Sequence, residues 1–146
     1  MKKTPYYKKT LSDGLRAVVI PMRATAAVTL SVLIGTGSKY ETKRISGVSH
    51  FLEHLFFKGS KKRPNPGDVH YELDRIGAEH NAATSKELTV YWVKTAAGHF
   101  DIALDVISDI LLNPLFKQEE IDKERGVISQ EINMYEDMPM RKVGDI

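Results

Sequence analysis

The feature that most restricts this chain of 146 residues is a short run in which reactive side chains interrupt an apolar, helix-forming stretch. The sequence of residues 48–57 is VSHFLEHLFF, with a glycine close to either end. Each residue of an α-helix advances by about 100°, so His50 and His54 lie about 40° apart, one turn above each other. Glu53 lies about 60° to the other side of His50. We therefore expect one helix to present two imidazoles and a carboxylate side by side.

These three side chains have the chemistry of a metal site. Two imidazoles at positions i and i+4 can reach one tetrahedral ion. Because the chain has no cysteine, a zinc site must use histidine and carboxylate ligands, the set typical of catalytic zinc. A carboxylate at Glu53 can act as a general base toward a water whose pKa zinc lowers to about 7. The bare motif also arises in ordinary helices, so it does not decide the function alone.

A zinc ion held by two imidazoles needs a third ligand, commonly a carboxylate. A long helix expected over residues 118–137 contains several glutamates. Two of them, Glu124 and Glu131, are seven positions apart and so lie within about 20° of each other among apolar residues. Carboxylates that face a core need a partner, and a metal with its ligand imidazole would supply one. A solvated acidic face is the alternative, and helix geometry leaves open which glutamate touches the metal.

The remaining patterns predict an α+β domain that spans residues 1–146 as one unit. Turn residues separate runs that favour strands and helices. Strands are expected at 6–11, 15–21, 26–34, 78–84 and 88–95, and further helices at 68–76 and 98–112. We expect a mostly antiparallel sheet with helices packed on one face, where the helix of His50 meets the helix of Glu131.

Composition argues against two other classes of protein. The formal net charge is only +2, and the basic loop at residues 58–67 has no base-stacking aromatic cluster, so we expect a solvated surface loop and no nucleic-acid site. No apolar run is long enough to span a membrane, and no apolar segment follows the first lysines as in a signal peptide. These observations favour a bacterial cytoplasmic location.

Three segments together carry a resemblance to a known family. They are GVSHFLEHLFFKG at 47–59, GAEHNAATS at 77–85 and the paired glutamates of ERGVISQEI at 124–132. The chain resembles the insulinase/pitrilysin family of zinc peptidases, and within it the bacterial members similar to mitochondrial processing peptidase. The resemblance implies a metallopeptidase half-clamshell fold with Zn²⁺ as cofactor. It makes His50 and His54 metal ligands and Glu53 the general base.

The resemblance also assigns roles to the two paired glutamates. The family leaves 76 residues between its second histidine and its third zinc ligand, and that spacing from His54 leads to Glu131. Glu124 then matches a glutamate outside the metal's own ligand set, which orients a ligand imidazole.

A third segment matches the strand that the family uses to hold its substrate. An exposed strand edge offers unpaired N–H and C=O groups that an extended peptide can satisfy. An ordinary strand end is the alternative for this segment. The matching residues are Asn81, Ala82, Ala83 and Thr84.

Members of this family are longer and have two homologous halves that close over the substrate. The resemblance therefore implies a fragment, the metal-binding part of the first half, with an arginine and a tyrosine of the second half missing. We expect a zinc endopeptidase that acts on peptides or unfolded segments, with the remaining half or a homologous subunit as partner. Exposed apolar surface predicts self-association. A non-catalytic assembly subunit and an inactive fragment are the alternatives; the presence of the whole ligand and base set favours the enzyme.

Overall fold

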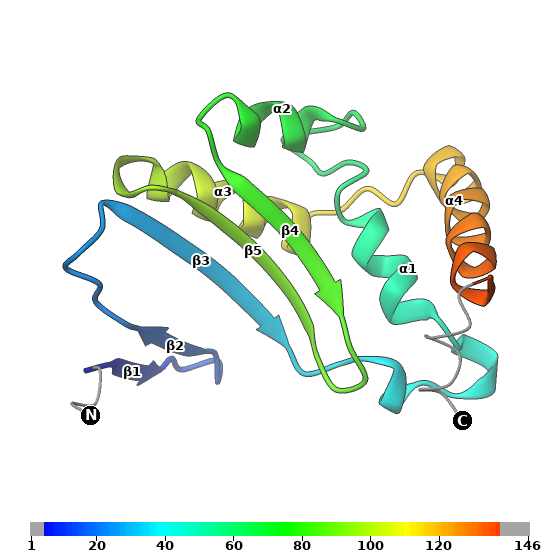
Figure 1. Cartoon of the computed structure of the whole chain (residues 1–146), viewed down its shortest axis with the longest axis horizontal. Helices are drawn as coiled ribbons and strands as arrows, with labels where there is room; N and C mark the ends of the chain where they lie inside the picture. The colour runs from blue at the N-terminus through cyan, green and yellow to red at the C-terminus, as the bar shows by residue number, and fades with distance from the viewer. Residues whose placement is uncertain (1–4, 138–146) are drawn as a thin grey trace.

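The computed structural model describes residues 5–137 and has an α+β architecture (Figure 1). Every expected strand and helix is present, with ends that differ by a few residues. The predicted extent of the domain over residues 1–4 and 138–146 lies outside the described part. The strands are β1 (Tyr7–Thr10), β2 (Arg16–Val19), β3 (Ala27–Ile34), β4 (Glu79–Thr84) and β5 (Thr89–Ala96), and the helices are α1 (Val48–Leu55), α2 (Asp68–Asp74), α3 (Phe100–Leu112) and α4 (Gln118–Glu136).

The central sheet has the strand order β3-β5-β4, and both pairings are antiparallel, as expected. Its register places Leu30 opposite Val93 and Ala82 opposite Tyr91, so alternate side chains of all three strands share one face. The helices α2 and α3 cover this face. The buried core consists of Val69, Leu73, Ala82, Tyr91, Val93, Ala103, Val106, Ile107 and Ile110.

The helices α1 and α4 extend this layer beyond the β4 side of the sheet (Figure 1). The end of α1 is tied to the core because the Phe56 ring packs edge-on against Tyr91, with 5.6 Å between ring centroids. The helix α4 then packs on α1. The two helices that contain the motif residues therefore meet, as the sequence predicted, but they do so beyond the β4 edge and not above the face of the sheet.

The hairpin of β1 and β2 forms a separate two-stranded sheet. Both strands are exposed along their whole length, including Tyr7, Val18 and Val19, each more than half exposed. The predicted exposed apolar surface is therefore confirmed here, whereas self-association stays a prediction. In the described part of the chain, none of the helices is long and apolar enough to cross a membrane.

Most of the basic loop at residues 58–67 is exposed, as its composition predicted, but its arginine is buried. Arg63 is only 6% exposed, and its guanidinium donates hydrogen bonds to Glu72, Asp105 and Asp109. Burial disfavours the charged form, but the carboxylates of Glu72 and Asp105 outweigh it and raise the pKa of Arg63. The prediction missed the burial of Arg63 because its acidic partners come from α2 and α3, which only the fold brings to the loop.

A close backbone contact joins the loop after β3 to the turn between β4 and β5. Lys39 N–H donates to the carbonyl of Lys86 at 2.9 Å, and Gly37 lies directly against the same turn. A Cβ on Gly37 would lie 2.2 Å from the carbonyl oxygen of Ser85, whereas a Cβ on Gly35 would meet nothing within 4 Å. Only a glycine at position 37 therefore allows this contact.

We predict that Gly37→Ala lowers the free energy of unfolding by about 1–3 kcal/mol, because backbone must move to admit the methyl group. Gly35→Ala is the matched control and should change it by less than about 0.5 kcal/mol. Urea unfolding followed by circular dichroism measures both. Equal stability of the two variants would contradict the predicted contact.

Candidate metal centre

The helix α1 begins with a cap supplied by an acid outside the motif. Glu41 accepts hydrogen bonds from the backbone N–H groups of Gly47 at 2.6 Å and Ser49 at 2.8 Å. These donors are otherwise left without partners at a helix start, where negative charge is also favourable. Burial tends to raise the pKa of Glu41, but the two backbone hydrogen bonds outweigh it and lower that pKa below 4.5. Glu41 therefore fixes the first turn of the helix that holds the histidines.

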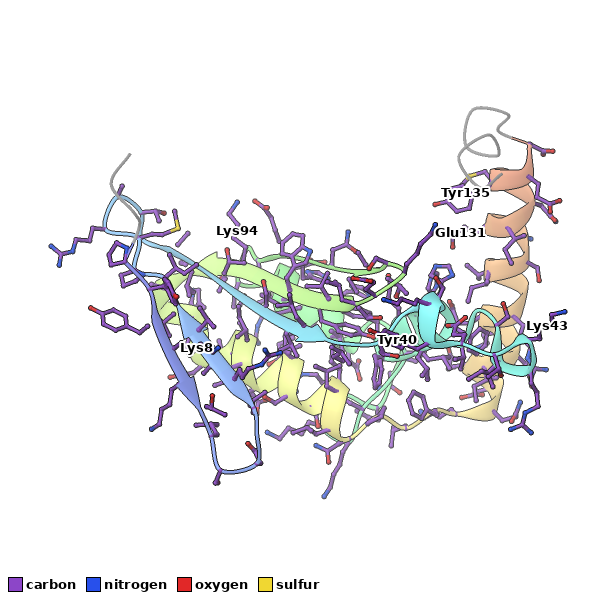
Figure 2. All side chains as sticks on the ribbon, turned by 90° about the horizontal axis from the view of Figure 1, so that it is seen from below. Lys8, Tyr40, Lys43, Lys94, Glu131 and Tyr135 are labelled. Atoms are coloured by element: carbon purple, nitrogen blue, oxygen red, sulfur yellow. The ribbon has the colours of Figure 1, made fainter. Side chains whose placement is uncertain are left out.

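Three ligand atoms converge between α1 and α4. The Nε2 atoms of His50 and His54 lie 3.2 Å apart, and the Glu131 carboxylate lies 3.7 Å from the first and 3.6 Å from the second. Tetrahedral zinc with bonds of about 2.0–2.2 Å separates its ligands by about 3.3–3.5 Å, so this triangle fits the ion. Figure 2 shows Glu131 on the side of α4 that faces the sheet. Within residues 5–137, no other three His, Asp or Glu side chains bring their ligand atoms within 4.8 Å of one another.

The orientation of His54 is set by a buried carboxylate. Glu124 is 3% exposed, and its two oxygens contact His54 Nδ1 at 3.0 Å and Lys58 Nζ at 2.6 Å. Burial would raise the pKa of Glu124, yet the hydrogen bonds from Lys58 and His54 lower it below its ordinary value. An ionised carboxylate only accepts, so Nδ1 of His54 donates and Nε2 keeps its lone pair for a metal. The alternative of a solvated acidic face is excluded for Glu124.

Glu53 lies on α1 but does not belong to the ligand triangle. Its carboxylate oxygen Oε2 accepts a hydrogen bond from the hydroxyl of Thr84 on β4. Glu53 therefore links the helix that holds both histidines to the sheet, while its role as a base stays a prediction. Sequence reasoning placed Thr84 with the substrate-binding segment and missed this contact, because a hydroxyl 31 residues away leaves no local pattern.

The strand β4 has one free edge among the described residues, because it pairs only with β5. The Ser85–Leu88 hydrogen bond fixes the ladder, so the N–H and C=O groups of Ala82 and Thr84 point to the free edge. The side-chain oxygen of Asn81 accepts from the N–H of Ala82 at 2.8 Å. The side chains of Asn81 and Ala83 project on the opposite face of the sheet from Ala82 and Thr84.

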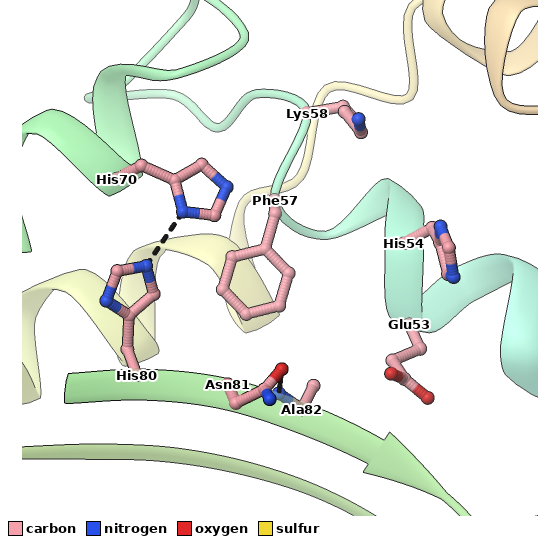
Figure 3. A pocket seen from close by; sticks show the side chains of 8 residues that line it. All are labelled: Glu53, His54, Phe57, Lys58, His70, His80, Asn81 and Ala82. Atoms are coloured by element: carbon pink, nitrogen blue, oxygen red, sulfur yellow. Dashed lines mark hydrogen bonds between the residues drawn. The ribbon is translucent and has the colours of Figure 1, made fainter. Parts of the chain in front are cut away.

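A pocket of about 210 Å³ connects this strand with the motif helix (Figure 3). Phe57 forms its middle and stacks on His70, with 5.6 Å between ring centroids. At the far end His70 Nδ1 and His80 Nε2 lie 2.7 Å apart. Burial and the neighbouring His80 lower the pKa of His70. Sequence reasoning did not single out these residues, since single histidines on separate elements carry no spacing signal. The pocket is lined by Glu53, His54, Phe57, Lys58, His70, His80, Asn81 and Ala82.

Comparisons with known proteins agree with this geometry. The model of the family described as Insulinase (Peptidase family M16) matches residues 16–145, which include the motif helix, β4 and α4. The chain belongs to the insulinase family of peptidases. It is 42% identical to the uncharacterized zinc protease YmxG of Bacillus subtilis over 94% of this chain and 33% of that protein. It is 39% identical to the beta subunit of mitochondrial-processing peptidase from Dictyostelium discoideum, over 84% of this chain and 26% of that protein.

Solved structures support the same fold. A protease from Helicobacter pylori superposes with a TM-score of 0.90 at 30% identity, over 95% of this chain and 34% of that one. Pitrilysin superposes with a TM-score of 0.79 at 24% identity, over 89% of this chain and 14% of that one, and shows the fold alone. The insulinase-family chain described here therefore spans about a third or less of the length of these relatives.

We predict that the chain binds about one Zn²⁺ and that Glu131→Ala weakens zinc affinity at least about a hundredfold, because the third ligand is lost. Glu136→Ala, at an exposed position of the same helix, should leave affinity unchanged. Mass spectrometry of metal content and competition with a chromophoric chelator measure both. Equal affinity in the two variants would remove Glu131 from the site.

We predict that Glu41→Ala lowers the free energy of unfolding by about 1 kcal/mol at neutral pH, the usual worth of a helix cap. Because the pKa of Glu41 is lowered on folding, this contribution is complete above pH 4.5 and is lost as pH falls through the folded pKa. The difference between the two proteins should therefore shrink in acid. Glu87→Ala, at an exposed surface ion pair, is the control. A difference that does not change with pH would contradict the assignment.

Proposed function

We propose that this chain is the zinc-binding, catalytic part of a metalloendopeptidase that hydrolyses peptide bonds in peptides or unfolded segments. The observation that carries the proposal is the His50, His54 and Glu131 triangle with Glu53 held beside it from the same helix. Two half-buried imidazoles and a carboxylate leave a fourth tetrahedral position open, the pattern of a catalytic rather than a structural site. The zinc-protease names of the relatives support the choice of metal.

The residues of the chain divide the chemistry between them. A bound Zn²⁺ would act as a Lewis acid that acidifies water and polarises the scissile carbonyl. Glu53 takes the proton from the attacking water and passes it to the departing amine. Glu124 and Lys58 keep the His54 ring oriented with its Nε2 atom toward the metal position. Each role belongs to a different side chain, so substitutions can separate them.

The free edge of β4 supports a substrate that binds as an added strand. The N–H and C=O groups of Ala82 and Thr84 are available there, and main-chain pairing would hold many peptide sequences alike. The Asn81 side chain now occupies the N–H of Ala82, and a substrate carbonyl would replace it. Glu53 contacts Thr84, so a peptide on this edge would lie next to the base.

The remaining length of the relatives supports a partner for this part. We infer that a second half, or a homologous subunit, completes the substrate-binding cleft in the cytoplasm of a bacterial cell. The name of the Dictyostelium relative, a subunit of a peptidase, supports an assembly of more than one chain, and a non-catalytic assembly role is the second candidate. The intact set of His50, His54, Glu131 and Glu53 in this chain supports the catalytic role over it.

We predict that Glu53→Gln keeps zinc affinity within about twofold but lowers kcat on a quenched fluorescent peptide by about a hundredfold or more, because the base is removed while the ligands stay. The assay uses the full-length protein, and Glu136→Gln is the matched control. A Glu53→Gln protein with near-normal kcat would overturn the role of Glu53. An unaltered protein that binds zinc but cleaves no peptide would favour the assembly role.

A further inference from the structure

A line of threonine hydroxyls leads from the sheet to the carboxylate of Glu53. The Thr84 hydroxyl donates to Glu53 Oε2, and the Thr89 hydroxyl lies 3.4 Å from that of Thr84. Thr89 in turn donates to the backbone carbonyl of Thr36 at 3.2 Å. Thr84 and Thr89 are opposite each other in the β4–β5 register, and Thr89 is only 3% exposed. The rigid strands of the sheet therefore determine where the Thr84 hydroxyl stands.

The direction of the Thr84 hydrogen bond follows from simple counting. An ionised carboxylate has no hydrogen and only accepts, whereas a hydroxyl has one hydrogen to donate. The hydrogen of Thr84 therefore goes to Glu53, and Thr84 can take a further hydrogen only through its own oxygen. Thr89 donates its single hydrogen to the carbonyl of Thr36, so its hydroxyl contacts that of Thr84 without competing for the hydrogen that Glu53 accepts. One oxygen of Glu53 is thereby fixed to the sheet, which leaves Oε1 for other partners.

We propose that Thr84 is the positioning residue for the catalytic base, holding Oε2 of Glu53 so that Oε1 is presented to the attacking water. This inference rests on the proposed function and changes the role of Thr84 from substrate contact alone to orientation of the base. The backbone of Thr84 stays free to pair with a peptide at the strand edge. A single residue then fixes the base and the substrate strand relative to each other.

Substitutions at Thr84 separate this role from a structural one. Thr84→Val keeps the shape and the β-branch but removes the hydroxyl, whereas Thr84→Ser keeps the hydroxyl and loses a methyl group. Thr95→Val is the matched control, because Thr95 lies on the same face of β5 as Thr89, is 4% exposed, and its hydroxyl has no hydrogen-bond partner among residues 5–137. All three variants should bind about one zinc, as the ligand set is unchanged.

In the full-length protein, Thr84→Val should lower kcat about ten- to a hundredfold with KM within about twofold, because a misplaced base loses part of its contribution. Thr84→Ser and Thr95→Val should keep kcat within about threefold. Undiminished turnover in Thr84→Val would overturn the inference, as would equal losses in Thr84→Val and Thr84→Ser. A loss expressed only in KM would assign Thr84 to substrate binding and would also overturn it.

A second measurement needs no catalysis and separates this inference from the proposed function. The melting temperatures of Thr84→Val, Glu53→Ala and the double variant form a thermodynamic cycle. If the two side chains interact, the double variant loses less than the sum of the single losses, by about 2 °C or more. The cycle of Thr95→Val with Glu53→Ala should be additive. Additive losses for Thr84 and Glu53 would overturn the contact. Coupling in a protein that cleaves no peptide would overturn the proposed function but leave the contact standing.

Discussion

The candidate metal centre depends on the contacts that the buried carboxylate of Glu124 makes. It lies between α1 and α4 and accepts from His54 on one oxygen and from Lys58 on the other. A carboxylate that is 3% exposed is costly without partners, so the packing of α4 on α1 is stable only with both contacts made. Glu131, two helical turns further along α4, is thereby brought within 4 Å of both histidine Nε2 atoms. The contact that joins the helices also brings the third proposed ligand to the other two.

Besides the contact of Glu124 with His54, three further contacts hold the helix α1, each from a different part of the chain. Glu41 caps its first turn, Phe56 packs on Tyr91 after its end, and Thr84 holds Glu53 in its last turn. Each contact orders a group on α1 before any ligand arrives. A site built this way presents the proposed ligands and the proposed base in a fixed relation, and the proposed hydrolysis would require preorganisation of this kind.

Residues outside the motif therefore determine much of the geometry of the candidate site. Arg63 illustrates the same rule away from the site, because its buried guanidinium ties the loop after α1 to α2 and α3. The loop composition predicted solvent exposure, since lysine, arginine, proline and glycine are typical of surface loops. The acidic residues that bury this charge come from distant segments, so no local pattern indicated them. For the same reason, no local pattern indicated the contacts of Lys58 and Glu41.

The sequence by itself determined the elements and the chemistry of each one. Periodicity predicted the strands and helices, and helix geometry placed His50, His54 and Glu53 together and Glu124 with Glu131. The inferences about the helices hold because each depends only on residues within about two turns of one helix. The family resemblance assigned different roles to Glu131 and Glu124, but only the tertiary structure shows that Glu131 faces both histidines while Glu124 faces His54 and Lys58. The contact of the Thr84 hydroxyl with Glu53 was also decided by the tertiary structure. Those relations join segments 31 or more residues apart, and packing rather than periodicity sets the distance between them.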